Sequence, residues 1–163
     1  MLRAYEERDV PAYAELLESS REHYAGFVPF LLEDEPAEQV GRSRAQFLAG
    51  EMFRYFAFVD DRLIGGCGLL PRIGPGALEI GYHVRADATG RGYATEMTAA
   101  LVEVAFSVCE VERVELHIEE ANLASVAVAR KLGFAETGYV EGRPTLRIFS
   151  RVRPSSESSV TSA

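Results

Sequence analysis

The chain contains little cysteine and no long run of apolar residues. Nothing in its 163 residues approaches the roughly 18 consecutive apolar residues that a membrane-spanning helix requires, and the first residues lack the apolar core of a secretory signal. We therefore expect a cytoplasmic protein that does not enter a membrane. Cys67 and Cys109 are the two cysteines, and neither belongs to a CxxC or Cys/His pattern. This argues against a disulfide framework and against a structural metal site.

Basic residues are also scarce relative to acidic ones. The sequence has 17 Lys and Arg against 25 Asp and Glu, a formal net charge of −8. This balance argues against sequence-independent binding to nucleic acid or anionic lipid and suits a cationic partner better. The length fits one domain, which we place at residues 1–153, and the serine-rich segment 154–163 predicts a flexible tail.

The hydrophobic pattern predicts a mixed α/β domain. Acidic residues followed by Pro11 and Pro36 predict helix starts, the first with Asp9 as N-cap. The expected elements are helices at about 11–23 and from 36 to before Gly50, a hairpin of strands 53–59 and 63–70 with a glycine-induced bulge, a strand at 77–85, a helix, a strand at 111–118, a short helix from 122 to 132, and two last strands at 134–140 and 145–152. This order predicts helices on both faces of one sheet.

A glycine turn separates the strand at 77–85 from the following helix. Gly90 and Gly92 permit a tight turn that directs backbone N–H groups outward at the positive end of the helix dipole, and Arg91 adds a cation. Such a turn can bind a phosphate, or it can be a plain strand-to-helix connection. The dinucleotide fingerprint GxGxxG and the Walker loop are both absent.

Four motifs jointly resemble the GNAT superfamily of acetyl-CoA-dependent N-acetyltransferases. They are EIGY at 79–82, GRGYATE at 90–96, NLAS at 122–125 and KLGF at 131–134. The similarity extends from about Leu2 to Arg151 and is greatest to the Rim-type branch, the ribosomal-protein N-terminal acetyltransferases. It implies the acyl-CoA N-acyltransferase fold, a mixed, mostly antiparallel sheet of about six or seven strands, and acetyl-CoA as co-substrate.

The same resemblance implies where coenzyme A binds. The cofactor would lie in a splay between the strand at 77–85 and the strand ending near Ile118, with Asn122 contacting the pantetheine arm. Backbone groups of His83 and Val84 would pair with that arm. The pyrophosphate would be held by the amides of Gly90, Arg91, Gly92, Tyr93, Ala94 and Thr95. Thr89 stands where the family has Gln or Arg, a departure that leaves these amides intact.

Acetyl transfer to an amine requires a base, donors for the developing oxyanion and a proton for the departing thiolate. Strand alternation places Glu79 and His83 on one face, so Glu79 can accept the amine proton directly or through water, or can be a salt-bridged strand acid. A backbone N–H near Val84 would polarise the thioester carbonyl.

The candidate for the thiolate's partner is Ser125. It matches the serine of the Rim-type branch, and its hydroxyl can protonate the thiolate or donate a hydrogen bond to it. Alternatively, the hydroxyl can cap its own helix. The tyrosine that other family members use four residues later is Ala129 here. His83 and His117 are alternative proton carriers, although a lone strand histidine is more often structural.

The acceptor is expected to be the α-amine of a protein or peptide. At pH 7 roughly a tenth of an α-amine is neutral, against a few in ten thousand of a lysine side chain, so an α-amine needs the weaker base. Phe27 and Phe30 resemble the aromatic-Pro-aromatic segment of the Rim-type branch and either wall the acceptor site or pack in the core. A small-molecule amine (an antibiotic, polyamine or amino acid) and a catalytically idle acyl-CoA-binding module are the alternatives. A homodimer is common among proteins of this kind.

Overall fold

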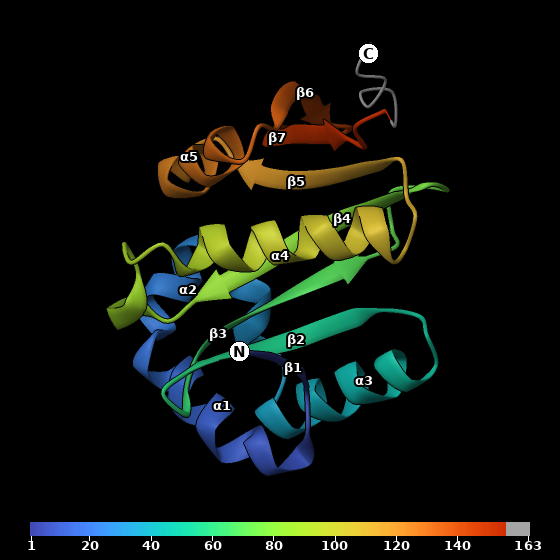
Figure 1. The fold of residues 1–163 in the computed structure, drawn as a ribbon. Helices are drawn as coiled ribbons and strands as arrows, with labels where there is room; N and C mark the ends of the chain where they lie inside the picture. The colour runs from blue at the N-terminus through green and yellow to red at the C-terminus, as the bar shows by residue number, and fades with distance from the viewer. Residues whose placement is uncertain (156–163) are drawn as a thin grey trace.

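A seven-stranded sheet organises the computed structural model, which describes residues 1–155 (Figure 1). The strands are β1 (Leu2–Ala4), β2 (Phe53–Val59), β3 (Arg62–Leu70), β4 (Ala77–Val84), β5 (Arg113–Glu119), β6 (Ala135–Val140) and β7 (Arg143–Val152). They lie in the order β1-β2-β3-β4-β5-β7-β6, and every described pairing is antiparallel except that of β4 with β5. The predicted mixed, mostly antiparallel sheet is confirmed.

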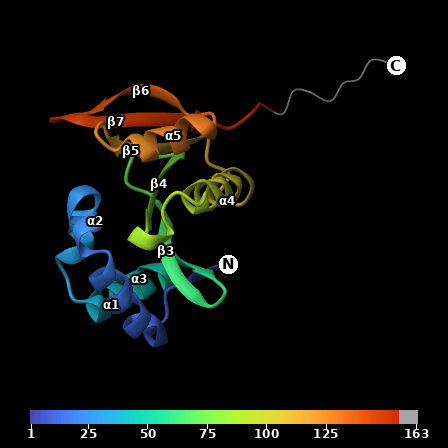
Figure 2. The ribbon, with the colours of Figure 1, turned by 90° about the vertical axis from the view of Figure 1, so that its left-hand side faces the viewer.

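Helices cover both faces of this sheet (Figure 2). They are α1 (Val10–Ser19), α2 (Arg21–Phe27), α3 (Pro36–Leu48), α4 (Tyr93–Ser107) and α5 (Leu123–Lys131), with short 3-10 turns η1 (Glu7–Asp9), η2 (Pro29–Leu32) and η3 (Ala86–Ala88). Helices α1, α2 and α3 lie on one face, around Tyr13, Tyr24 and Phe56. Helices α4 and α5 lie on the other face, where Leu101 and Val126 belong to the larger apolar core.

The first helix departs from the prediction, because the segment 11–23 is divided between α1 and α2. The break is at Ser20, whose backbone has φ −114° and ψ 9°. Its hydroxyl accepts a hydrogen bond from the Ala86 N–H at 3.0 Å, so a distant loop fixes the break. Asp9 is not the expected side-chain cap of α1, since its carboxylate is bound by Arg3 instead.

Glycines in β3 allow β4 to approach closely. The register of β2 and β3 shifts between Ala57 and Phe58, which confirms the predicted bulge. A Cβ atom at Gly66 would lie 2.8 Å from His83 Nε2, so a side chain there would displace the imidazole. Small residues in β3 therefore fix the position of His83 in β4.

The other predicted elements agree with the structure to within a few residues, whereas the short edge strand β1 was not predicted. The strand at 77–85 ends one residue earlier, at Val84, and Arg85 begins the following loop. No helix of the described residues is long and apolar enough to cross a bilayer. The predicted flexible tail, 154–163, lies outside the described residues from position 156 onward.

Candidate active site

The site lies where β4 and β5 separate. The two strands pair only from Ala77 to Glu79 with Arg113 to Glu115, although β4 continues to Val84 and β5 to Glu119. Beyond Glu79, the edge of β4 that faces β5 has no strand partner within the described chain. Free backbone groups on such an edge can pair with an extended ligand as if it were an added strand. The predicted splay is present.

The glycine turn lies beyond the open end of this splay, at the start of α4. Gly90 and Gly92 have φ of +73° and +87°, a left-handed conformation that favours glycine. No side chain caps α4, and its first backbone bond runs from the Glu96 N–H to the Gly92 carbonyl at 3.0 Å. The amides of residues 93–95 precede that bond and are free to bind an anion. A Cβ atom at either glycine would meet nothing within 4 Å, so the turn is open.

Two side chains of this turn differ in their availability to a ligand. Arg91 is exposed and forms no ion pair with any residue from 1 to 155. The Thr89 hydroxyl donates to the Ala86 carbonyl at 2.9 Å and so stabilises the loop itself. The turn therefore offers one free cation together with its amides.

Glu79 lies on the opposite face of the sheet, in a cluster of paired charges. Both of its oxygens accept hydrogen bonds from Arg72, from Nε at 2.7 Å and from Nη2 at 2.6 Å. His117 lies between two carboxylates, with Nδ1 3.6 Å from Glu79 Oε2 and Nε2 2.8 Å from Glu115 Oε2. The Glu115 carboxylate also accepts from Arg113. Glu79 is thus a salt-bridged acid beside an imidazole that is itself bound to a second acid.

Arg72 and Glu115 were not identified from the sequence. Strand alternation could have placed Glu115 beside His117, because Val114 and Leu116 point into the core on the other face. Its position next to Glu79 follows from their direct pairing in the parallel register. Arg72 follows the end of β3, and no periodic signal indicates the direction of its side chain.

His83 is buried on the same face as Glu79 but beneath α2. Its Nδ1 atom lies 3.0 Å from the Tyr24 hydroxyl, and its buried Nε2 atom has no hydrogen-bond partner in the described chain. Burial lowers the pKa of His83 to about 4, so the ring is neutral at physiological pH. This favours a structural role for the imidazole, while the backbone of His83 and Val84 borders the splay.

Ser125 and Asn122 lie at the start of α5, across the splay from β4. The cap of α5 is Asn122, whose Oδ1 atom accepts from the Ser125 N–H at 3.2 Å. The Ser125 hydroxyl is therefore not the cap of its own helix, and the alternative interpretation of Ser125 as a self-capping residue is wrong. Asn122 keeps its amide nitrogen for other contacts.

Phe27 and Phe30 are exposed at the end of α2 and in η2. Their exposed fractions are 43% and 61%, so the alternative that both pack in the core is wrong. Their neighbours Val28 and Leu31 do pack against the apolar cluster below α1 and α2. The two phenylalanines are thus available to contact a ligand on this face.

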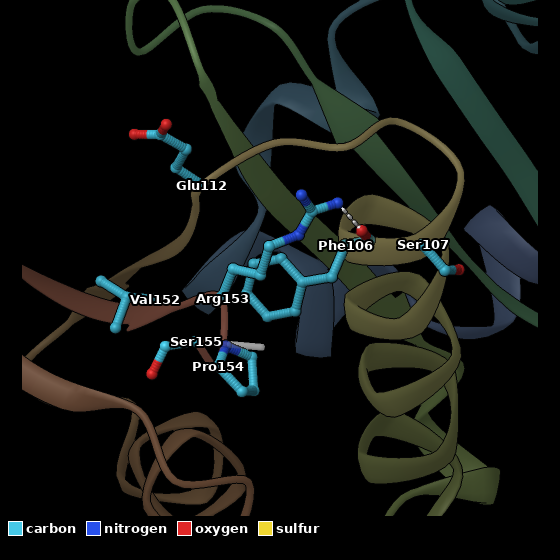
Figure 3. Close-up of a pocket in the computed structure, with 7 residues that line it drawn as sticks. All are labelled: Phe106, Ser107, Glu112, Val152, Arg153, Pro154 and Ser155. Atoms are coloured by element: carbon cyan, nitrogen blue, oxygen red, sulfur yellow. Dashed lines mark hydrogen bonds between the residues drawn. The ribbon is translucent and has the colours of Figure 1, made fainter. Parts of the chain in front are cut away.

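A surface hollow lies away from these groups, at the C-terminal end of α4 (Figure 3). Phe106, Glu112 and Arg153 line it, and Arg153 donates a hydrogen bond to the Phe106 carbonyl. Because the glycine turn opens at the N-terminal end of the same helix, the hollow is not part of the site. Within residues 1–155 there is no cluster of three or more His, Cys, Asp or Glu side chains that could hold a metal ion.

Comparison with known proteins agrees with this geometry. The family described as "Acetyltransferase (GNAT) domain" matches residues 1–135. "Probable N-acetyltransferase YjcK" of Bacillus subtilis (strain 168) is 37% identical over 89 residues, which cover 53% of this chain and 49% of that protein. The match therefore spans about half the length of that relative.

Two solved structures share the whole fold. RimJ of Mycobacterium smegmatis, in complex with CoA-disulfide, has a TM-score of 0.80 at 23% identity, over 93% of this chain and 80% of its own. RimL, a ribosomal L7/L12 α-N-protein acetyltransferase in complex with coenzyme A, has a TM-score of 0.78 at 22% identity, over 93% and 92%. At these identities the likeness establishes the fold.

Proposed function

Since the chain belongs to the GNAT acetyltransferase family, whose members use acetyl-CoA, we propose that it acetylates the α-amine of a protein or peptide N-terminus. The observation that carries this proposal is the separation of β4 from β5 after Glu79. The resulting gap connects an anion-binding turn on the α4 side with a carboxylate and imidazole cluster on the other face. Donor and acceptor can then meet within the sheet.

On the donor side, this chain's backbone does most of the binding. The amides of the turn at 90–95 bind the pyrophosphate, and the free edge of β4 at His83 and Val84 pairs with the pantetheine arm, which Asn122 also contacts. Acetyl-CoA supplies an acyl group activated as a thioester. A backbone N–H near Val84 donates to the carbonyl oxygen, where negative charge develops during attack.

On the acceptor side, Glu79 takes the proton that the amine loses, directly or through water. Without substrate, Arg72 binds both oxygens of this carboxylate, and His117 Nδ1 lies 3.6 Å from Glu79 Oε2. The amine nitrogen forms the new bond to the carbonyl carbon, and the carbon–sulfur bond breaks. Ser125 donates a hydrogen bond or a proton to the departing sulfur.

The choice of an α-amine rests on the base and on the exposed aromatic residues. A carboxylate already engaged by Arg72 suits an amine that is partly neutral at pH 7, which applies to an α-amine far more than to a lysine side chain. The exposed rings of Phe27 and Phe30 can cover the first side chains of a bound peptide. The likeness to RimL, a ribosomal L7/L12 α-N-protein acetyltransferase, supports a protein substrate.

A small cationic amine is the second candidate. The net charge of −8, together with Glu115 beside Glu79, favours a polyamine or an aminoglycoside. A catalytically idle module would keep the turn and dispense with the base. The homodimer and the cytoplasmic location stay predictions from the sequence.

A thiol-release assay over a panel of amines tests the proposal. The panel pairs each peptide bearing a free N-terminus with the same peptide blocked at its N-terminus and containing one lysine, and adds a polyamine and an aminoglycoside. We expect turnover only with free N-termini. Turnover with the polyamine alone would overturn the choice of acceptor. Coenzyme A binding by calorimetry without turnover on any amine would establish the idle module.

A further inference from the structure

The imidazole of His117 is bound to one carboxylate and only faces another. Its Nε2 atom lies 2.8 Å from Glu115 Oε2, whereas its Nδ1 atom lies 3.6 Å from Glu79 Oε2. The first distance is that of a charge-assisted hydrogen bond, and the second exceeds the length of any N–H···O bond. Glu115 therefore fixes the ring, and the side of the ring that faces Glu79 is left without a bond to it.

Glu115 is a second buried acid beside the proposed base. It pairs directly with Glu79 in the parallel register of β4 and β5, and its side chain is only 12% exposed. Like charges placed directly opposite each other in a sheet destabilise it. Separate arginines offset this repulsion, because Arg72 binds Glu79 and Arg113 donates to Glu115 Oε1 at 2.8 Å. An uncharged residue at position 115 would avoid both the burial of a charge and the repulsion.

The hydrogen bond to Glu115 determines which ring nitrogen of His117 carries the proton. A carboxylate that is paired with a guanidinium can only accept, so the proton of this bond lies on Nε2. In the neutral ring Nδ1 then has a lone pair, and that lone pair faces Glu79. Two acceptors 3.6 Å apart can both bind N–H groups of the same nitrogen atom of a third molecule.

These acceptors lie where the two strands separate. Glu79 and Glu115 are the last paired residues of β4 and β5, and His117 follows two residues later, where β5 no longer pairs with β4. Opposite His117 on β7 is Ile148, which does not titrate. An amine that binds Glu79 at this gap therefore comes within reach of His117 Nδ1.

We propose that Glu115 is a positioning residue, which holds the His117 ring so that Nδ1 accepts an N–H group of the acceptor amine while Glu79 takes the proton. This inference rests on the proposed function and deepens it. The amine is then bound at two points, which orients its lone pair for attack on the thioester carbon. Glu115 itself contacts neither the amine nor the coenzyme and acts only through the imidazole.

NMR spectroscopy of the protein without substrate tests the positioning separately from turnover. We expect the neutral His117 ring to carry its proton on Nε2 and to give a downfield ring N–H signal, which His117→Gln removes and so assigns. Glu115→Gln should shift this signal upfield, because a hydrogen bond to a carboxylate is about twice as strong as one to a neutral amide. Glu119→Gln is the matched control on the same face of β5, since its carboxylate binds Arg143 and Thr145. It should leave the signal unchanged.

Thiol release with a peptide that has a free N-terminus tests the consequence for catalysis. Glu115→Gln should lower kcat about tenfold, which corresponds to the loss of one hydrogen bond to a charged group. In the His117→Gln background the same substitution should cost nothing further, because Glu115 acts only through His117. If the two losses multiply instead, Glu115 has a separate structural role and the proposal is wrong.

The outcomes separate this inference from the proposed function. If the wild-type protein turns over no peptide, the proposed function is wrong and the inference falls with it. If peptides are acetylated but the ring proton lies on Nδ1, or Glu115→Gln leaves the ring signal unchanged, only the positioning role is wrong. Glu115→Asp is a second variant in case Glu115→Gln does not fold. It keeps a carboxylate for Arg113 but withdraws it from the ring, so it should also shift the signal upfield.

Discussion

Glu79 shows how an acid can be buried in a strand and still be available for chemistry. Its side chain is 8% exposed, and Arg72 satisfies both of its oxygens from a side chain that is 58% exposed. An arginine at the surface can be displaced by an arriving amine, whereas an arginine buried at the same place would hold the carboxylate permanently. The Arg72 and Glu79 pair is thus compatible with a reaction on this face.

Replacing Glu79 by glutamine tests this interpretation. Glu79→Gln keeps the shape but cannot accept the amine proton, so kcat should fall by about 10²–10⁴ and the acidic limb of the pH profile should disappear. Steady-state thiol release from pH 6 to pH 9 measures both. Glu18→Gln is the control, because the Glu18 carboxylate on α1 is exposed and is paired only with the exposed Arg21. It should change neither kcat nor the pH profile. An unaltered rate and pH profile in Glu79→Gln would indicate that His117 or water, and not Glu79, is the general base.

His83 makes stability depend on pH. Its pKa is lowered to about 4 by burial, so below about pH 6.5 the unfolded chain binds a proton that the folded protein does not. Stability should therefore fall as the pH decreases from about 6.5 to about 4, by at most about 3 kcal/mol. Urea unfolding at pH 7.5, 5.5 and 4.5 measures this loss. His83→Gln should show a smaller loss, and parallel curves would exclude a neutral, buried imidazole.

At the scale of elements, Arg85 joins α1 to the end of β4. Its side chain is only 3% exposed, and its guanidinium binds Glu15 at 2.8 and 2.9 Å, Asp87 at 2.9 Å and the Ser19 hydroxyl at 3.0 Å. The arginine thus fixes the helix beside the loop that leads to the glycine turn. It links the acceptor-side helices to the donor-side turn.

Glu15→Gln tests this connection. Hydrogen bonding to Arg85 lowers the pKa of Glu15, so the charged carboxylate contributes stability above the pKa of the unfolded chain, and this is lost as the pH falls through the lower folded value. Because Glu15 is 60% exposed, we expect Glu15→Gln to destabilise by no more than about 1 kcal/mol at pH 7. The difference should vanish well below pH 4. Chemical denaturation at pH 7 and pH 3 measures it, and equal differences at both would contradict the account.

The glycine turn provides a second test at this scale. Gly92→Leu places a side chain over the amides of α4, so the KM for acetyl-CoA should rise about tenfold or more. Gly50→Leu is a matched control, because Gly50 also has a positive φ, +71°, and open space around it, but lies at the end of α3. Both variants should lose similar stability, and only Gly92→Leu should weaken the binding of acetyl-CoA. Equal KM values would contradict anion binding at this turn.

Local signals explain what the sequence could predict. The glycines at 90 and 92, the strand alternation around Glu79 and the Asn122 motif each act over a few residues, and the structure keeps these elements where they were expected. The break at Ser20 depends on a partner 66 residues away, and no local pattern shows it. The Arg72 contact with Glu79 likewise depends on how separate elements pack.

At the scale of the whole molecule, the sheet consists of two parts. Strands β1 to β4 form one and β5 to β7 the other, and three parallel residue pairs connect them. Helix α4 packs across the junction, since it contacts both β4 and β5. The connection is therefore narrow at the place where we propose that the coenzyme binds.

Hydrogen exchange tests this view of the junction. Coenzyme A should slow exchange at the amides of residues 80–84 that face β5 and at those of residues 92–95, because both sets gain partners. Amides of β1 and β2 should exchange at unchanged rates. Exchange followed by mass spectrometry with and without the ligand measures this. Protection confined to other segments would place the coenzyme elsewhere.

The separated strands also constrain inhibitor chemistry. Because the turn that we propose binds the coenzyme and the cluster around Glu79 lie on opposite faces of the sheet, a compound that joins both substrates must pass between β4 and β5. Its tether has to be unbranched and as thin as a thioester chain. Because the strands stay apart beyond Glu79, such a compound can enter through the open end of the gap, with its two bulky ends on opposite faces of the sheet.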